Sequence, residues 1–530
     1  MVGHEMSNTN YEYLGGTRSG FLSNIAHDLD AGNATTALNS NHSYDNSILS
    51  FFGRAFYSYD DRYLLTATIR EDGSSQFAKG HQWGMFPSGA FGWKVSNEKF
   101  MKDFKFINSL KLRLGYGAVG NQNVEQWAFA STMKAITNNW GGGLNYMNMG
   151  NEDLTWETTY AANAGFDLNM FKNRVELVFD VYYKKTKNLL LELALPAYMG
   201  TTGSGSMEAP WANVGSLINK GIEATINTIN YDKKGFSWKS NIVFSMNKNE
   251  VSELNIQSGV VDRTMTDPNG VSTVVTRTVV GQPIGQFYGY KVIGRFNSMT
   301  DFYYKDASGK VKEVPRPEGT AISENSVWLG DYIFEDVNGD GVINANDQTF
   351  IGDPNPLFTF GFGNTFAYKN WDFTIYLNGS YGNDVLNYVR RWSEEPSQTT
   401  NLFKSALDYP VVKGTGNEAT ISGGDAHMYR LSATNANTNN RMSNRYIEDG
   451  SYIRIQNISF GYTFPRKITR KFSAEAARVY VNLQNVYTFT KYKGYDPEVG
   501  CYGSDALLQG VDYGRYPSAR IFTAGLSLTF

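Results

Sequence analysis

The sequence predicts an all-β protein, an antiparallel transmembrane β-barrel, and three observations carry this prediction. Segments of roughly ten residues alternate apolar and polar side chains, which is the pattern of a two-faced strand and the length that crosses a bilayer at a tilt. Short and long connections alternate between these segments, as they do in outer-membrane barrels. The chain has 34 Tyr, 33 Phe and 53 Gly but only 14 Pro, which favours strands joined by tight turns.

The last eleven residues, RIFTAGLSLTF, carry the clearest strand pattern. Their apolar side chains share one parity, namely Phe522, Ala524, Leu526, Leu528 and Phe530. A soluble sandwich would leave the terminal aromatic at a fraying end, whereas a membrane barrel places it in the interfacial aromatic girdle. Because half-buried strands of soluble proteins alternate too, the prediction depends on repetition of the pattern along the chain.

That repetition begins after a polar N-terminal region. Residues 1–48 are rich in Asn, Ser, Thr and Gly, and we expect them to form loop. A hairpin signal follows, with segments 51–59 and 63–70 around the turn Asp60-Asp61. The further alternating segments are 91–95, 110–117, 160–168, 175–183, 222–226, 236–246, 358–368, 371–377, 458–464, 479–483 and 522–530. We therefore expect about thirteen strands.

The connections separate a membrane barrel from a soluble alternative. Short turns fall near residues 60, 171, 233 and 369, whereas the other links are long, at 119–157, 184–219, 248–355, 383–451 and 490–519. A sandwich or a propeller would have evenly short links. Counting through the short turns makes the first and last strands run in the same direction, which no closed single-chain bacterial barrel does. We therefore expect more strands and a signal sequence upstream, since the first residues lack the basic and apolar regions of a secretory signal.

Composition excludes several classes of protein. The formal net charge of −3 and the pI near 6.1 give no sign of nucleic-acid binding. Mean hydropathy is −0.39 and no apolar run approaches the length of a membrane-spanning helix. Cys501 is the single cysteine, so the chain has no internal disulfide.

Several stretches resemble the SusC/RagA-type TonB-dependent transporters of the Bacteroidota outer membrane. They are YLLTATIREDGSSQF (63–77), SLKLRLGYGAVGNQ (109–122), LTWETTYAANAGFDL (154–168), NVGSLINKGIEATIN (213–227), VGQPIGQFYGYKVIG (280–294), EDVNGDGVINANDQTFIGDPNP (335–356), GSYIRIQNISFGYTFP (450–465), VYVNLQNVYTFTKYKGYDPEV (479–499) and VDYGRYPSARIFTAGLSLTF (511–530). The resemblance implies a barrel of about twenty-two strands around an N-terminal plug. It places residues 49–530 in the C-terminal part of that barrel, with the plug and the signal peptide outside this chain.

The resemblance also implies a function and partners. These are energised uptake of oligosaccharides or peptides across the outer membrane, a SusD-like surface lipoprotein over the long loops, and the TonB–ExbB–ExbD system acting through the N-terminal part. A non-energised structural or adhesive barrel, or an inactive gene fragment, is the alternative. The five His residues lie scattered without metal spacing or a nucleophile motif, so we expect no enzyme activity and no required cofactor.

One loop motif has the ligand spacing of a calcium site. Residues 336–347, DVNGDGVINAND, place Asp336, Asn338 and Asp340 at positions one, three and five, the Val342 carbonyl at seven and Asp347 at twelve. Asp at position twelve in place of a bidentate Glu would weaken such a site. The alternative is that Asn-Gly-Asp-Gly is simply tight-turn chemistry in an outer loop.

Substrate contacts are expected on the long loops, because loops on a rigid scaffold commonly carry binding residues. The loop aromatics Trp140, Tyr146, Trp211 and Trp328 offer faces for sugar rings or for apolar side chains of peptides. Packing between loops, or against a lid protein, is the alternative role. Gly115 and Gly117 sit in a G-x-G-x-x-G match without the following helix of a nucleotide site. We interpret them, with Gly461 and Gly525, as positions that leave the lumen face bare for close approach of another backbone.

Overall fold

The computed structural model describes residues 1–25, 27–138, 141–193, 207–267, 270–395, 401–424, 427–432 and 434–530. One large antiparallel sheet dominates it and has fourteen strands in the described part of the chain, each beside the next along the sequence. They are β1 (Val2–Thr17), β2 (Leu38–Tyr59), β3 (Tyr63–Ser74), β4 (Trp83–Lys94), β5 (Ile107–Asn121), β8 (Glu157–Met170), β9 (Val175–Lys187), β12 (Gly215–Lys233), β13 (Phe236–Leu254), β24 (Phe358–Tyr368), β25 (Trp371–Tyr381), β30 (Tyr452–Thr463), β31 (Ala476–Thr490) and β33 (Ile521–Thr529). The predicted all-β class and the predicted hairpin order are confirmed.

The chain forms two compact units. Unit 1 comprises 1–103, 111–165 and 182–218, and unit 2 comprises 104–110, 166–181 and 219–530. In unit 1, Phe77, Phe86, Leu154 and Trp156 form the centre of a buried cluster. Unit 1 also holds two small sheets, β6 (Thr132–Asn138) with β7 (Gly141–Asn148) and β10 (Leu190–Glu192) with β11 (Trp211–Asn213).

The N-terminal region differs from the loop expected over residues 1–48, and that expectation is wrong for most of it. β1 pairs with β2 in one unbroken antiparallel ladder, from Val2 opposite Gly53 to Thr17 opposite Leu38. Nearly every residue of β1 is exposed, and polar side chains lie on both of its faces. Backbone hydrogen bonds form this ladder without an apolar face, and for that reason the Asn- and Ser-rich sequence gave no strand signal.

The predicted short turns are confirmed. Asp60, Phe171, Lys234 and Lys369 each have a left-handed backbone, with φ of 51°, 54°, 53° and 53°, and each lies between consecutive strands. Such φ values match the right-handed twist of the flanking strands in a tight hairpin.

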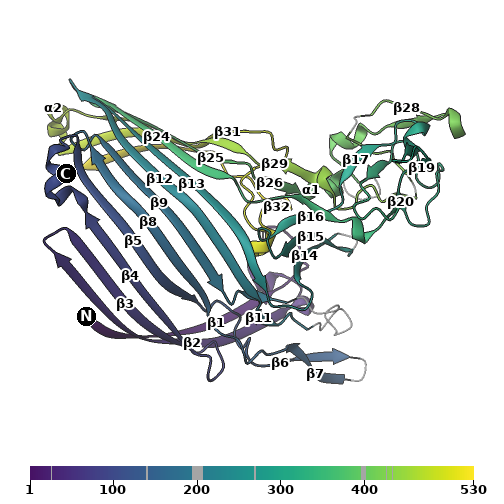
Figure 1. Cartoon of the computed structure of the whole chain (residues 1–530), viewed down its shortest axis with the longest axis horizontal. Helices are drawn as coiled ribbons and strands as arrows, with labels where there is room; N and C mark the ends of the chain where they lie inside the picture. The colour runs from purple at the N-terminus through teal and green to yellow at the C-terminus, as the bar shows by residue number, and fades with distance from the viewer. Residues whose placement is uncertain are drawn as a thin grey trace. The chain divides into compact units, whose positions relative to one another are not determined.

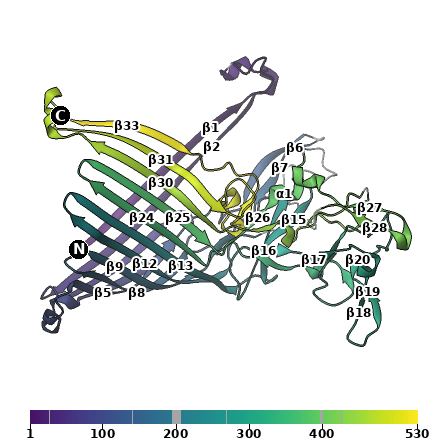
Figure 2. The ribbon, with the colours of Figure 1, turned by 90° about the horizontal axis from the view of Figure 1, so that it is seen from above.

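In unit 2 the alternate apolar residues lie opposite one another from strand to strand. Phe366 pairs with Phe373, Phe373 with Phe460, Phe460 with Val481, and Val481 with Ala524. Figure 2 shows β24, β25, β30, β31 and β33 running side by side. We call this side of the five strands the apolar face, and it includes the terminal row of Phe522, Leu526 and Phe530.

The apolar face is most exposed along the last strand and the residue that follows it. Phe522, Leu526 and Phe530 are 75%, 61% and 80% exposed. The predicted row is therefore outside any closed core, and an exposed apolar surface of this extent is typical of contact with lipid or with another protein.

The opposite face of the same strands is polar. Asp372, Gly461, Tyr480 and Gly525 lie opposite one another in that order, and the Arg478 Nε donates to the Asp372 carboxylate at 3.1 Å. A Cβ added to Gly525 would lie 2.3 Å from Cζ of Tyr480. Gly525 and Gly461 therefore make room for side chains of the neighbouring strands. The close approach of another backbone expected at Gly115, Gly117, Gly461 and Gly525 stays a prediction.

The long connections of unit 2 fold into small sheets of their own. Their strands are β14 (Val260–Thr266), β15 (Ser272–Val279), β16 (Gln286–Gly289), β17 (Val292–Arg295), β18 (Tyr303–Lys305), β19 (Val311–Glu313), β20 (Arg316–Pro317), β21 (Tyr332–Phe334), β22 (Val342–Ile343), β23 (Thr349–Gly352), β26 (Asp384–Asn387), β27 (Val411–Lys413), β28 (Thr420–Ser422), β29 (Ile447–Asp449) and β32 (Val511–Asp512). We call residues 255–357, 382–451 and 491–520 the loop assembly.

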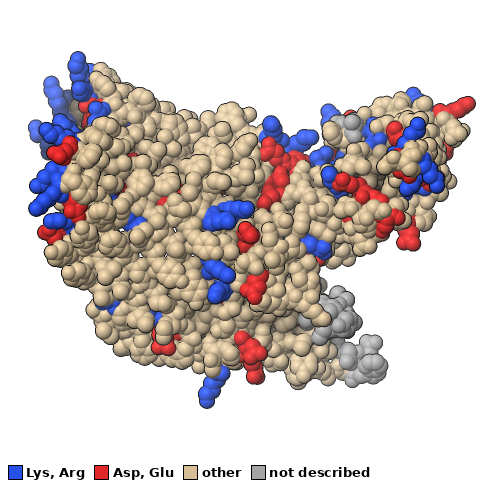
Figure 3. All heavy atoms as spheres, in the orientation of Figure 1, with Lys and Arg blue, Asp and Glu red and all other residues tan. Residues whose placement is uncertain are grey.

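The loop assembly lies at one end of unit 2. Its elements β17, β19, β20 and β28 are far from the short helix α2 (Arg466–Thr469), which follows β30 at the other end (Figure 1). Charged atoms gather around α2 and over the loop assembly, while the strands between them show mostly uncharged atoms (Figure 3). The second helix, α1 (Tyr388–Ser393), belongs to the loop assembly. Within the described residues, neither helix has the length or the apolar character needed to span a membrane.

Candidate ligand-binding site

The aromatic residues predicted to contact substrate lie in different surroundings. Tyr146, on β7 of unit 1, is half exposed, and Trp211 packs against the buried cluster of that unit. Trp328, in unit 2, is only 4% exposed and packs against Phe302 with a ring-centroid distance of 6.1 Å. Trp140 lies outside the described residues. Trp328 is therefore packed between loops, as its alternative role expects, because apolar residues of 296–333 and 412–421 enclose it.

Two carboxylates of the 336–347 loop accept hydrogen bonds from backbone amides of the same loop. Asp336 accepts from the amides of Gly339 and Gly341 at 2.7 and 2.8 Å, and Asp347 accepts from those of Val337 and Asn344 at 3.0 and 2.7 Å. Among the described residues, no three His, Cys, Asp or Glu side chains converge at metal-binding spacing. The calcium site at Asp336, Asn338, Asp340, Val342 and Asp347 stays a prediction, while the hydrogen bonds match the turn chemistry of the alternative.

A buried network of charges lies in the loop assembly and begins at α1. Asn387 caps this helix by accepting from the Arg390 amide at 3.2 Å. One turn separates Arg390 from Glu394, whose carboxylate meets the Arg390 Nε at 3.0 Å. The Glu394 carboxylate also meets an Arg445 Nη at 2.5 Å and accepts from the Ser405 hydroxyl at 2.6 Å.

A second carboxylate extends this network. Glu448, on β29, accepts from an Arg390 Nη at 3.1 Å and from the backbone amide of Lys493 at 2.9 Å. Three segments that are distant in sequence, around residues 390, 445 and 493, therefore meet at one place. We call Arg390, Glu394, Arg445 and Glu448 the charge network.

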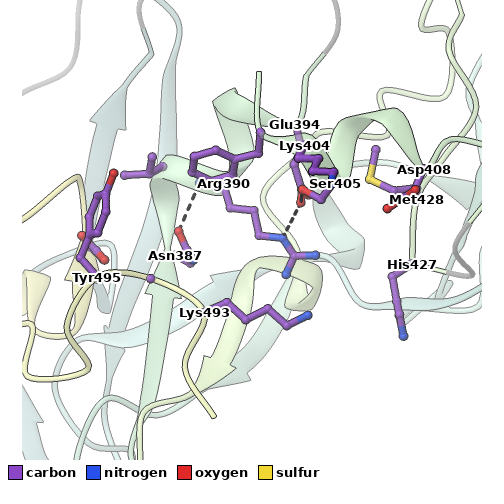
Figure 4. A pocket seen from close by; sticks show the side chains of 14 residues that line it. Asn387, Arg390, Glu394, Lys404, Ser405, Asp408, His427, Met428, Lys493 and Tyr495 are labelled. Carbon is purple, nitrogen blue, oxygen red and sulfur yellow. Dashed lines mark hydrogen bonds and ion pairs between the residues drawn. The ribbon is translucent and has the colours of Figure 1, made fainter. Parts of the chain in front are cut away.

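Two cavities lie beside the charge network, and they share Arg390, His427 and Lys493 as lining residues. The first cavity has a volume of about 390 Å³, and its lining side chains are drawn in Figure 4. Its apolar and aromatic wall is made by Val389, Phe403, Met428 and Tyr495. The second cavity has a volume of about 540 Å³ and is lined by Arg295 and Arg445 in addition to the three shared residues. Both volumes fall in the range of small-molecule sites.

Burial fixes the protonation state of the groups around the network. Burial raises the pKa of Tyr332 and of Tyr429, so both phenols stay protonated and act as donors. The Tyr332 hydroxyl donates to the carbonyl of His427 at 2.5 Å. Burial also acts to raise the pKa of Glu394, but the guanidinium groups of Arg445 and Arg390 outweigh it and hold that pKa below its usual value. Glu394 is therefore a carboxylate at neutral pH.

None of these charged residues appears among the sequence-based site predictions. One local signal was present, since RRWSEE places Arg390 and Glu394 at the i,i+4 spacing of a helical ion pair. The pairing of Glu394 with Arg445 joins residues 51 positions apart, and no local pattern reports it.

A sheet of consecutive antiparallel strands with one apolar and one polar face, and with long loops at one end, is typical of the wall of a transmembrane β-barrel. The chain matches the model of the TonB dependent receptor-like β-barrel over residues 3–340. It belongs to that family, and its relatives identify it as a SusC/RagA-type member.

The relatives are considerably longer than this chain. TonB-dependent receptor P3 of Formosa agariphila is 34% identical over 97% of this chain and 49% of its own length. TonB-dependent receptor SusC of Bacteroides thetaiotaomicron is 32% identical over 92% of this chain and 44% of its own length. The chain thus spans about half the length of the curated relatives it matches. The RagAB peptide transporter matches all of this chain and 53% of its own chain in fold, with a TM-score of 0.77 at 22% identity.

Proposed function

We propose that this chain forms part of the barrel of an outer-membrane TonB-dependent transporter that takes up oligosaccharides or peptides. The apolar face of β24, β25, β30, β31 and β33 is the observation that carries the proposal. Its side chains lie in a continuous register and range from half-buried on β24 and β25 to exposed on β33, while the opposite face holds polar groups and the ion pair of Arg478 with Asp372. Hydrocarbon on one side and a polar lumen on the other account for both faces.

The proposal includes two partners. A SusD-like surface lipoprotein closes over the loop assembly, and the TonB–ExbB–ExbD system supplies the force for uptake. The relationship to SusC and the fold shared with the RagAB transporter support these partners. The loop assembly suits a lid, because its small sheets build an ordered surface at one end of unit 2.

Growth of a deletion strain on single nutrient sources tests the proposal. We expect growth to fail on one glycan or peptide source and to return with the complete gene. Uptake of that source should stop when a protonophore collapses the proton gradient, and the protein should be found in the outer-membrane fraction. Retained growth on every source, or uptake that resists the protonophore, contradicts energised transport and favours a structural barrel or an inactive fragment.

A further inference from the structure

Basic side chains gather at the end of unit 2 where the short turns lie. Two of them lie at the turn between β8 and β9, two at the turn between β12 and β13, and one at the turn between β24 and β25. Four more lie in residues 463–475, which follow β30 and include α2, and Figure 3 shows Lys and Arg atoms around this helix. All nine residues are exposed. We call them the basic rim: Lys172, Arg174, Lys233, Lys234, Lys369, Arg466, Lys467, Arg470 and Lys471.

The basic rim is continuous, because backbone hydrogen bonds join each turn to the next. The Ile229 amide, near the end of β12, donates to the Arg174 carbonyl at 2.8 Å. The Lys369 amide donates to the Gly235 carbonyl at 2.8 Å. The turn after Lys369 is joined in the same way to residue 463, whose amide donates to the Asn370 carbonyl at 2.9 Å. The cations of successive turns therefore follow one edge of the sheet.

Carboxylates lie beside the three turns and offset part of their charge. Asp232 is in the turn between β12 and β13. Glu176, just after the turn between β8 and β9, accepts from the Asn227 side chain at 3.0 Å. Asp372, just after the turn between β24 and β25, pairs with Arg478 on the polar face. The turns are therefore partly balanced, and the segment around α2 is the most cationic part of the basic rim.

The segment around α2 has more positive than negative charge. Residues 463–475 contain four basic side chains and one acidic side chain, Glu475, which meets a guanidinium of the same segment at 3.8 Å with both groups exposed. Among the residues that the structure describes, no carboxylate lies within ion-pair distance of Lys467, Arg470 or Lys471. These three cations are therefore available to an anion from outside the chain.

Exposed apolar side chains alternate with the cations of the basic rim. Ile468 and Phe472 are exposed and lie four residues apart, within and just after α2. At the neighbouring turn, Tyr368 and Trp371 are exposed on either side of the basic residue, and the Trp371 ring lies 4.5 Å from that of Tyr462 on the apolar face. Aromatic and basic residues at the end of an apolar surface are typical of a membrane–water interface.

The segment is fixed to the sheet by groups other than its cations. Thr469 and Ala474 are buried, and the Ala474 amide donates to the Thr469 carbonyl at 3.2 Å. The Glu475 amide donates to the Thr529 carbonyl at 2.6 Å, which joins the segment to the last strand. Because the basic side chains take no part in these contacts, their removal should leave the segment folded.

We propose that the basic rim binds the phosphate groups of anionic phospholipids, with Lys467, Arg470 and Lys471 as its main contacts, while Ile468 and Phe472 contact the acyl chains. Short turns of outer-membrane barrels lie on the periplasmic side, so the lipid belongs to the periplasmic leaflet. A lipid surface accommodates both the cations and the apolar side chains between them, whereas a soluble acidic partner matches the cations alone. This inference rests on the membrane barrel of the proposed function and is independent of its cargo.

Native mass spectrometry of the complete transporter in detergent tests the basic rim. The probes are phosphatidylglycerol and phosphatidylethanolamine with the same acyl chains. Phosphatidylglycerol should bind more tightly, and its affinity should fall as the ammonium acetate concentration rises. Each basic residue near an anionic lipid surface contributes about a five-fold factor in affinity. The triple variant Lys467→Gln, Arg470→Gln, Lys471→Gln should therefore bind phosphatidylglycerol about a hundred-fold more weakly, with its affinity for phosphatidylethanolamine unchanged.

The matched control is the triple variant Lys305→Gln, Lys310→Gln, Lys413→Gln. It removes the same number of exposed positive charges from the loop assembly, far from α2. This variant should bind phosphatidylglycerol as the unmodified transporter does. Heat-modifiability gels that are the same for both triple variants and the unmodified transporter show that altered binding is not caused by misfolding.

Several outcomes overturn the inference. They are that the two lipids bind equally, that the triple variant of the basic rim keeps its affinity for phosphatidylglycerol, or that the control loses as much. Displacement of phosphatidylglycerol by an equal concentration of glycerophosphoglycerol also overturns it, since the acyl chains then contribute nothing. Tighter binding of an octaglutamate peptide than of phosphatidylglycerol assigns the rim to an acidic protein instead.

The proposed transport function is tested separately from lipid binding. It stands after any of these outcomes, provided that the unmodified gene restores protonophore-sensitive growth to the deletion strain. Absence of that growth refutes transport, even if phosphatidylglycerol binds the basic rim as expected.

Discussion

Removal of the Glu394 carboxylate should loosen the loop assembly more than removal of an exposed ion pair. Glu394 is 2% exposed and accepts from Arg390, Arg445 and Ser405. In Glu394→Ala the two guanidinium groups lose a shared carboxylate while they remain largely buried. Breaking a buried pair by removing one partner costs about 3–5 kcal/mol, whereas an exposed pair contributes about 0–1 kcal/mol.

Hydrogen–deuterium exchange of the purified protein measures this difference. We expect amides in 384–395 and 440–449 to lose protection in Glu394→Ala by a free energy of about 3–5 kcal/mol. Lys312→Ala is the control, because Lys312 is 52% exposed and meets Asp306 at 3.3 Å on the surface of the same assembly. Protection that changes equally in both variants, or in neither, refutes the stabilising role of Glu394.

The pKa of Glu394 predicts a pH dependence of the same protection. Because the folded-state pKa lies below the ordinary value of 4.5, the contribution of this carboxylate to stability is fully present above pH 4.5. It is lost as the pH falls through the lower folded-state value. The unmodified protein should therefore lose protection in 384–395 below about pH 4.5, and Glu394→Ala should lack this acid-dependent step.

Four further predictions address the sheet and the loops. Leu526→Lys should lower the free energy of unfolding of the barrel in lipid vesicles by about 2–4 kcal/mol, measured by urea titration. Thr523→Lys, on the polar face, should lower it much less. Equal effects of the two variants would contradict lipid contact by the apolar face. Gly525→Ala should lower the yield of folded barrel on heat-modifiability gels because its Cβ meets Tyr480, and Tyr480→Ala should restore that yield. Trp328→Ala should destabilise its loop by about 3–5 kcal/mol, seen as faster limited proteolysis, without weakening ligand binding. Terbium luminescence should appear on titration of the intact protein and disappear in Asp340→Ala, and no signal at millimolar metal contradicts the calcium site.

The strand pattern was predictable because it is local. Alternation of side chains along β33 and its neighbours sets which face is apolar, and residues such as Lys369 mark the tight turns between strands. The short turns predicted the neighbouring pairs β2 with β3, β8 with β9, β12 with β13 and β24 with β25, since a short turn joins only antiparallel neighbours. The local residue pattern did not predict β1, because its polar residues form a ladder through backbone hydrogen bonds alone.

The site was largely unpredictable because its contacts are not local. Trp328 looked like an exposed loop aromatic, but Phe302 and the rest of its cluster enclose it. The pairing of Glu394 with Arg445, and the approach of Lys493 to Glu448, depend on how separate loops fold together. Only the helical spacing of Arg390 and Glu394 was available from the sequence.

Stability alone does not explain the charge network. Replacing a buried ion pair by well-packed apolar residues is often neutral or stabilising, because desolvation of the charges offsets much of their attraction. Apolar side chains at 390, 394 and 445 would thus hold the loops together about as well. They would not place two guanidinium groups on the wall of the second cavity, where Arg390 and Arg445 lie beside Lys493. The carboxylates of Glu394 and Glu448 fix the orientation of these two guanidinium groups at the cavity wall.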